Sequence, residues 1–227
     1  MTWQRARIEE LTRRFLIPED SADPKELKRR RLVASASELF AHHGYRKTSI
    51  DDIARGARVA KGTVYLYFES KADLLLHALV AEKTAHMGVF LELLDGPLDA
   101  RERLRGFLRL SFTLIHQMPL TSRVTQPDME IAQVLEELDP GFVATLEAGQ
   151  RATYRSFLEP FAAEQGWSEA DLVDRAATLV SVLYLAAPIG DQGLRVGLSI
   201  ARHAELMADA LVDGFAGPLR SAPIEQG

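Results

Sequence analysis

Four polar side chains lie close together in the first third of the chain: Lys61, Thr63, Tyr65 and Tyr67. They fall in the string Val-Ala-Lys-Gly-Thr-Val-Tyr-Leu-Tyr-Phe, which predicts a short helix beginning near Lys61. Side chains at the start of such a helix reach base edges, where lysine donates and threonine offers a hydroxyl and a methyl group. Tyr65 suits bases or phosphates, and Tyr67 suits phosphates. The chemistry indicated is contact with a DNA duplex.

Two helices joined by a turn are needed to hold these side chains against a duplex. Residues 49–56 predict the first helix, with Thr48 or Ser49 as its cap. The turn follows over 56–59, and the second helix is expected over 60–66. In a helix-turn-helix the second helix enters the major groove while the first crosses the backbone. Because helix pairs of this spacing are common, the alternative is an ordinary corner with partly buried tyrosines.

The distribution of charge favours the DNA interpretation. The whole chain carries a net charge of −5, yet residues 25–75 hold 11 Lys/Arg against 6 Asp/Glu, a net of +5. Residues 76–227 hold 12 against 21, a net of −9. A phosphate-binding surface requires local positive charge, and DNA repels the acidic remainder, which orients the docking. The basic segment also offers Tyr45, Thr48 and Lys71 to phosphates.

The rest of the sequence has the apolar periodicity of helices, without strand alternation or a hairpin signal. An all-α chain of about nine or ten helices is therefore expected. The other predicted helices cover 3–16, 24–43, 71–94, 99–118, 127–138, 140–165, 168–187 and 194–215. Asp23 and Pro24 signal the start of the second of these, as N-cap and first helical residue. Pro160 is expected to kink or interrupt its helix.

These patterns divide the chain into an N-terminal extension over 1–23, a three-helix helix-turn-helix domain over 24–75 and a helical domain over 76–227. The extension is either a flexible segment with residual helicity or an arm that reaches DNA or packs on the first helix. The last two predicted helices have narrow polar faces, so they need a partner, either the core or a second subunit. Candidate dimer-interface residues are Leu172, Ala176, Leu179, Leu183, Leu198, Ala201, Ala204, Met207, Ala208 and Leu211.

The sequence shows no catalytic or metal-binding constellation. It has no cysteine, which excludes disulfides, thiolate metal sites and a cysteine nucleophile. The six histidines show no HxxxH or HExxH pattern. Gly197-Leu-Ser-Ile-Ala201 is similar to a nucleophile elbow but lacks the second glycine and a preceding strand. We therefore expect neither an enzyme nor a cofactor.

No apolar run approaches the roughly 20 residues that span a membrane, and no signal peptide is visible, so a cytoplasmic protein is expected.

Several strings in the basic segment carry a family resemblance: Phe40-Ala-His-His-Gly-Tyr45, Thr48-Ser-Ile-Asp-Asp-Ile-Ala54, Val59-Ala-Lys-Gly-Thr-Val-Tyr-Leu-Tyr-Phe68 and Ser70-Lys71. Together they closely resemble the N-terminal domain of the TetR family of bacterial one-component transcriptional repressors. At the level of motifs the resemblance covers residues 30–75, and beyond them only helix count, order and length match. The match implies DNA contact for Ser49, Lys61, Gly62, Thr63, Tyr65, Tyr67 and Lys71.

The resemblance also implies a homodimer on a palindromic operator, and a C-terminal cavity whose filling by a small molecule releases DNA. Candidates to line such a pocket are Phe107, Ser111, His116, Tyr154, Phe157, Trp167 and Tyr184. Each is alternatively a plain core residue. Their mixture suggests a small apolar or amphipathic effector.

Two residues depart from the family pattern. Arg58 occupies the position before the turn's valine, where members usually carry glycine, so it must adopt a conformation that glycine favours or the turn differs. Ala60 replaces the serine that usually caps the recognition helix, which removes a cap and a hydroxyl near a phosphate.

The sequence therefore predicts a ligand-responsive DNA-binding transcriptional regulator, and a repressor in the first instance, although activation remains open. Two alternatives also remain. The first is a DNA-binding dimer that organises the chromosome, and the second is a helical small-molecule-binding protein whose helix-turn-helix is vestigial.

Overall fold

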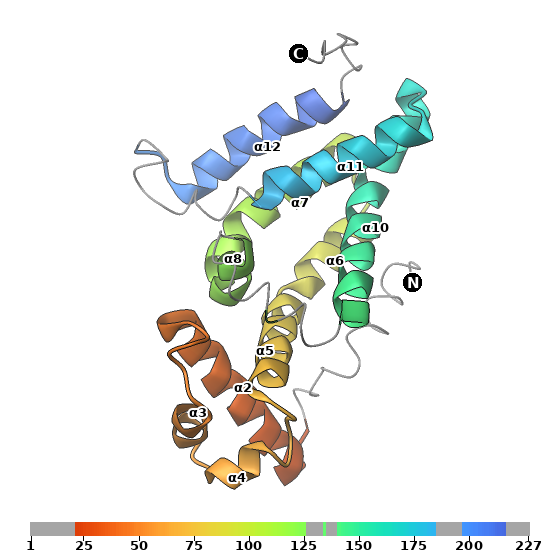
Figure 1. Cartoon of the computed structure of the whole chain (residues 1–227). Coiled ribbons are helices and arrows are strands. Elements are labelled where there is room, and N and C mark those ends of the chain that lie inside the picture. Colours follow the sequence, from red (N-terminus) through yellow and green to blue (C-terminus); the bar gives the residue numbers. More distant parts are fainter. Residues whose placement is uncertain (1–20, 126–133, 135–139, 185–196, 217–227) are drawn as a thin grey trace, which may run out of the picture.

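The computed structural model describes residues 21–125, 134, 140–184 and 197–216 (Figure 1). These residues form ten α-helices and one short 3-10 helix, and none of them lies in a strand. The prediction of an all-α chain is confirmed. The expected helix over 3–16 and most of the one over 127–138 lie outside the described residues.

One end of the molecule contains α2 (Pro24–His43), α3 (Ile50–Gly56), α4 (Lys61–Val64) and α5 (Lys71–Ala85). The other end contains α6 (Met87–Asp95), α7 (Ala100–Leu114), the 3-10 helix η1 (Ile115–Gln117), α8 (Pro119–Thr125), α10 (Pro140–Gln165), α11 (Glu169–Tyr184) and α12 (Ile200–Ala216). Figure 1 shows α4 at one extreme of the molecule and α11 and α12 at the opposite extreme, with α5 and α8 between them.

The first two helices begin where their capping residues predict. The Asp23 carboxylate accepts from the backbone N–H of Lys25 at 2.9 Å, which satisfies a donor that the helix itself leaves open. Gly44 then ends α2 with φ of 82°, in the left-handed region. Ser49 caps α3 and forms a capping box with Asp52, in which each side chain accepts from the other residue's backbone N–H.

The predicted helix over 71–94 is wrong as a single element. It breaks at His86 into α5 and α6, which are bent by 41° relative to each other. Just before the break, the Thr84 hydroxyl donates to the carbonyls of Val80 at 2.8 Å and Ala81 at 3.1 Å. Threonine bonded back to its own helix in this way commonly bends it. Apolar periodicity cannot reveal such a bend, because it continues on both sides.

Later boundaries also differ from the predictions. The helix expected over 99–118 ends at Leu114, continues as η1, and is followed by the unpredicted α8. Helix α10 has the predicted bounds and runs on through Pro160, so no interruption occurs there. Helix α12 begins at Ile200, six residues after the predicted start at 194.

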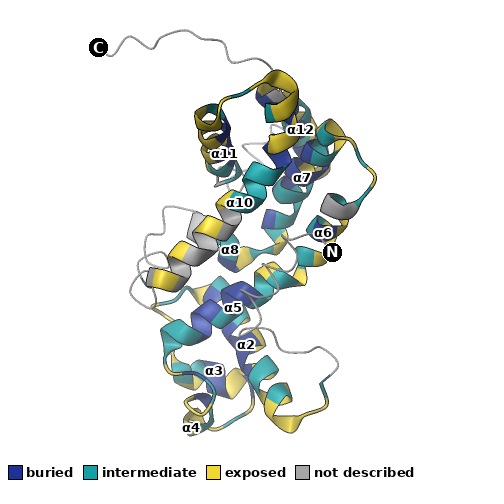
Figure 2. Cartoon of the chain, turned by 90° about the vertical axis from the view of Figure 1, so that its right-hand side faces the viewer, coloured by how far each residue is buried: buried dark blue, intermediate teal, exposed yellow. Residues whose placement is uncertain are grey.

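The described residues build two apolar cores (Figure 2). The first surrounds α2 and α5 and includes Leu32, Phe40, Leu74 and Leu79, each at most 5% exposed. Leu120 of α8 belongs to this core and is fully buried in it, although the sequence places it far along the C-terminal segment. The second core joins α7, α10, α11 and α12.

Specific polar contacts hold α3 against α2 and α12 against α7. The Ser35 hydroxyl on α2 donates to the Ile53 carbonyl of α3 at 3.1 Å, and a Cβ at Gly56 would lie 2.3 Å from that hydroxyl. Glycine is therefore required at this crossing. Helix α12 is tied to α7 by exposed ion pairs of Arg101 and Arg105, which complement the buried apolar contact between the two helices.

Among the described residues, no single helix has the length and apolar character to cross a membrane. The bent pair formed by α5 and the first part of α6 meets those criteria only when taken together, and on length and composition alone.

Replacing Arg58 with glycine should stabilise the domain. Arg58 has φ of 57°, which costs an L-residue roughly 1–2 kcal/mol, whereas the extra chain entropy of glycine costs roughly 0.4–1 kcal/mol. We expect Arg58→Gly to raise the free energy of unfolding by up to about 1 kcal/mol, measured by urea denaturation. Arg55→Gly, inside α3, is the matched control and should lower it by about 1 kcal/mol. Equal losses in both variants would contradict the strain argument.

Candidate nucleic-acid interface

The recognition element is a single turn of helix at the tip of the molecule. Helix α4 begins at Lys61, and Tyr65 follows it in helical geometry. Tyr65 is 53% exposed, whereas Val64 and Phe68 are buried in the domain core. The inward pair anchors the element, and Tyr65 and Leu66 between them face outward. The structure therefore separates core side chains from solvent-facing ones within this short element.

Lys61 is held in place by an acidic neighbour on α3. Its ammonium donates to the Asp51 carboxylate at 2.7 Å, with both side chains about half exposed. That hydrogen bond, together with the charge of Asp51, raises the pKa of Lys61 above its usual value, so the lysine is fully charged at neutral pH. An exposed pair of this kind is easily exchanged for a phosphate or a base.

Gly62 and Thr63 lie on the same outward turn. Gly62 is exposed, and a Cβ added there would meet nothing within 4 Å. The fold itself therefore leaves room for a side chain at this position, and glycine serves instead to present a bare backbone. Thr63 is half-buried beside it.

Ser49 presents its hydroxyl at the start of α3. The hydroxyl donates to the Asp52 carboxylate at 2.5 Å and accepts from the Asp52 N–H at 3.2 Å. These bonds from the hydroxyl and the backbone of Ser49 lower the pKa of Asp52. Ser49 is thus fixed by its capping role and is also exposed.

Thr48, Tyr45 and Lys71 form a bracket that closes the domain. The Lys71 ammonium donates to the carbonyls of Tyr45 at 2.9 Å and Thr48 at 3.0 Å, and it lies 4.1 Å from the centre of the Tyr45 ring. Thr48 is 2% exposed, and its hydroxyl donates to the carbonyls of Gly44 and Leu39. The Thr48 hydroxyl therefore supports the loop from inside, which corrects its assignment as an outward-facing phosphate contact.

Both irregularities expected in the turn are present. Arg58 adopts a positive φ, as a residue in a glycine position must, and its side chain is exposed. Ala60 stands at the N-cap of α4 in extended geometry, without a side-chain hydrogen bond to the helix. Tyr67 is half-buried on the far side of the same turn and packs against the core.

Leu66 is a candidate contact that sequence reasoning missed. It lies between the two tyrosines and is 78% exposed, an unusual state for a leucine. Apolar side chains read the methyl group of thymine in the major groove. The signal in the sequence was an apolar residue on the polar side of the recognition turn.

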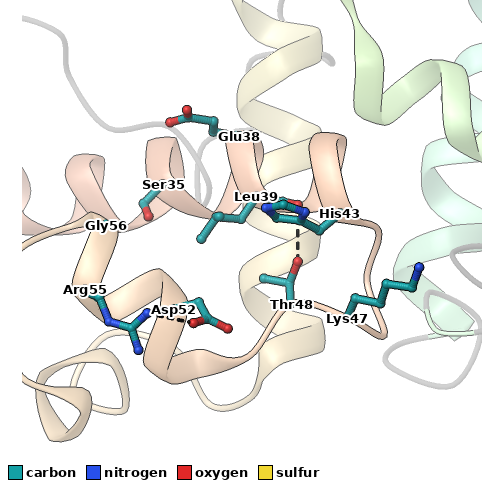
Figure 3. A pocket seen from close by; sticks show the side chains of 9 residues that line it. All are labelled: Ser35, Glu38, Leu39, His43, Lys47, Thr48, Asp52, Arg55 and Gly56. Carbon is teal, nitrogen blue, oxygen red and sulfur yellow. Dashed lines mark hydrogen bonds and ion pairs between the residues drawn. The ribbon is translucent and has the colours of Figure 1, made fainter.

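A surface hollow of about 570 Å³ lies between α2 and α3 (Figure 3). Its lining includes Ser35, Leu39 and Thr48 at the base, and the Arg55–Asp52 ion pair at one side. Charged side chains of both signs line the hollow, and Glu38 is one of the negative ones. The hydrogen bond from the Thr48 hydroxyl to the Leu39 carbonyl closes its base. It is the seam between two packed helices.

Four of the predicted pocket residues pack against the second core. Phe107 stacks on Phe157 with ring centres 4.1 Å apart and meets Tyr154 at 5.5 Å. Trp167 lies beneath the Arg175 guanidinium at 4.0 Å from its ring centre. Ser111 and His116 are half-buried on α7 and η1, and the side chain of Tyr184 lies outside the described residues. Phe107 and Phe157 therefore belong to the second core, and Tyr154 and Trp167 pack against it.

The predicted dimer interface needs correction. Five of its residues are at most 6% exposed within a single protomer: Leu172, Ala176, Leu179, Ala204 and Ala208. They pack in the second core, where a second subunit cannot reach them. Leu183, Met207 and Leu211 are partly buried against the same core, whereas Leu198 and Ala201 are exposed. Most of the apolar residues that were expected to contact another subunit are instead buried, fully or partly, within the protomer's own core.

Comparison with known proteins explains the helix-turn-helix. The family described as bacterial regulatory proteins, tetR family, matches residues 32–78, which run from α2 through α5. Residues 32–78 are therefore a DNA-binding domain of the TetR family. The match includes the recognition turn, the Lys71 bracket and the start of α5, so it covers most of the first core but not Leu79 or Leu120.

Three TetR-family relatives show how far the similarity extends. The fatty acid metabolism regulator protein of Bacillus subtilis is 30% identical over 132 residues, 54% of this chain and 66% of the relative, just under two thirds of its length. The transcriptional repressor KstR2 of Rhodococcus jostii is 28% identical over 63% of this chain and 75% of its own. The solved structure of FadR from Bacillus subtilis with stearoyl-CoA has a TM-score of 0.63 at 20% identity, covering 82% of this chain and 98% of that one.

Removing the acidic partner of Lys61 should strengthen DNA binding. Asp51 occupies the lysine and adds negative charge beside the recognition turn, so we expect Asp51→Asn to raise affinity for a duplex severalfold at low salt. Fluorescence anisotropy against a labelled duplex measures the change. Glu164→Gln, an exposed carboxylate on α10, makes the same change of net charge as a control. A similar gain in that control would show that only the overall charge matters.

Proposed function

We propose that the protein is a transcriptional repressor that binds a palindromic operator and releases it when an effector binds the C-terminal domain. The observation that carries the proposal is the outward turn of Lys61, Gly62 and Tyr65, presented at the tip of the only basic segment of an acidic chain. Its buried neighbours hold it rigidly, which is what groove recognition requires.

A dimer supplies the second recognition turn that a palindrome needs. The outer faces of α11 and α12 support this part of the proposal, because they expose Val173 at 50% and Leu206 at 42%. Ala177 lies one turn after Val173 and Ala210 one turn after Leu206, and both alanines are exposed, which permits close helix approach. These outer faces, rather than the buried stripes, are the proposed subunit contact.

A long-chain acyl thioester is the proposed effector. The similarity to a fatty acid metabolism regulator and to a structure holding stearoyl-CoA supports this class. Within the chain, the aromatic cluster of Phe90, Phe107, Tyr154 and Phe157 offers the apolar surroundings that an acyl tail requires. Since these rings contact one another, binding has to part them, which couples effector entry to movement of α7 and α10.

Loss of two outward side chains should abolish specific binding. The target duplex is first selected from a random library with the wild-type protein. We expect Lys61→Ala combined with Tyr65→Ala to weaken binding to that duplex at least about tenfold, with a salt dependence reduced by about one phosphate contact. Arg109→Ala, an exposed charge on α7, should leave affinity unchanged. If the double variant bound as tightly as the wild type, the vestigial interpretation would hold.

Stearoyl-CoA should release the protein from that duplex. A coupling of about 1–3 kcal/mol between the two sites predicts a loss of DNA affinity of about 5- to 150-fold at saturation. Free coenzyme A, which lacks the acyl tail, is the control and should have no effect. An unchanged anisotropy titration with stearoyl-CoA present would contradict the proposed effector class, while leaving the DNA-binding proposal to its own test.

A further inference from the structure

The chain passes from one core to the other within five residues. Ile115 of η1 lies in the second core with Phe107 and Phe112, and Leu120 of α8 lies fully buried in the first. Between them Met118 leaves helical geometry, with φ of −121° and ψ of 68°. Helix α8 is therefore continuous in sequence with the C-terminal domain but is packed into the DNA-binding domain.

A carboxylate on α5 holds the beginning of α8. One oxygen of Glu82 accepts from the N–H of Leu120 at 3.0 Å, and the other accepts from the N–H of Thr121 at 2.7 Å. The remaining donors of that first turn are accounted for, because Pro119 has no N–H and Ser122 bonds to the carbonyl of Met118. Glu82 thus supplies the two bonds that this helix start would otherwise lack.

A second bond ties the other end of α8 to α2. The Arg123 guanidinium Nε donates to the carbonyl of Ala41 at 3.1 Å, in the last turn of α2. Backbone carbonyls in that turn have no partner within their own helix, so a charged donor stabilises them. Helix α8 is thereby fastened at both ends to the two helices that carry the recognition turn.

We infer that Glu82 and Arg123 are positioning residues, which make α8 a rigid part of the DNA-binding domain and the element through which the C-terminal domain orients it. The hinge is then the short segment from Ile115 to Met118, which precedes α8 in the chain, while the contact of α8 with α2 and α5 stays fixed. Displacement of α7 reaches α2 and α5 through α8 because three contacts, Leu120, Glu82 and Arg123, move together.

Paired spin labels test the inference without any effector. The chain has no cysteine, so Arg55→Cys on α3 and Glu164→Cys on α10 label the two domains of one protomer. Labelled chains diluted in unlabelled protein give one interlabel distance. We expect Glu82→Ala to broaden or shift that distance distribution, Glu82→Gln, which keeps one acceptor oxygen, to change it less, and Glu92→Ala on α6 to leave it unchanged.

Folding is checked separately. Glu82→Ala must retain the wild-type helical circular dichroism, while amide exchange at Leu120 and Thr121 rises at least about tenfold. Arg123→Met, which removes the other fastening, provides a second variant if Glu82→Ala does not fold. A distance distribution unchanged in both folded variants would overturn the inference.

The response to the effector distinguishes a positioning role of Glu82 from a purely stabilising one. This third experiment rests on the proposed function. With stearoyl-CoA as the probe, Glu82→Ala should bind it as the wild type does but lose most of the effector-driven change in DNA affinity. Full retention of that change would count against the inference. If stearoyl-CoA has no effect on the wild type, the proposed effector fails and the spin-label distances alone decide the inference.

Discussion

The packing of α2 against α5 is the contact on which the rest of this structure depends. Phe40, Leu74 and Leu79 lie fully or nearly fully buried between the two helices, and burying each such side chain contributes roughly 1.5–3 kcal/mol. Helix α3 is fitted across α2 through Ser35, and the recognition turn is pinned beneath it through Val64 and Phe68. A four-residue helix has little stability of its own, so its geometry is borrowed from this core.

The same core reaches out of the DNA-binding segment to take in Leu120. The two cores are therefore joined by more than a single covalent linker. The chain bends at His86, between α5 and α6, as it leaves the DNA-binding core, and α8 later contributes Leu120 to that core. The acidic C-terminal part is therefore connected to the DNA-binding core at two places, the junction of α5 with α6 and helix α8. With two connections, a displacement of the C-terminal part changes the orientation of the DNA-binding core, whereas a single flexible linker would absorb it.

Local chemistry explains why so much of the DNA-binding domain was predictable. Asp23, Pro24 and Gly44 bound α2, and the Ser49–Asp52 capping box starts α3, because caps depend on residues a few positions apart. Arg58 was expected to be strained because members of the family that the sequence resembles usually carry glycine at that position, and its φ of 57° confirms this. The predictions failed at α8, whose start depends on the carboxylate of Glu82, a residue distant in sequence. They also failed at the bend at His86, where the Thr84 hydroxyl bonds to carbonyls of its own helix without changing the apolar periodicity.

The sequence by itself determined the helical class, the helix-turn-helix and its charge, since these follow from periodicity, caps and composition. Only the tertiary structure decided which apolar faces are consumed within the protomer, because Leu179 and Ala208 have the same hydrophobic pattern whether they meet their own chain or another. It also decided that Thr48 points inward and that Leu66 points outward. Burial is a property of the assembled fold, and an amino-acid pattern specifies that a face must be covered without specifying what covers it.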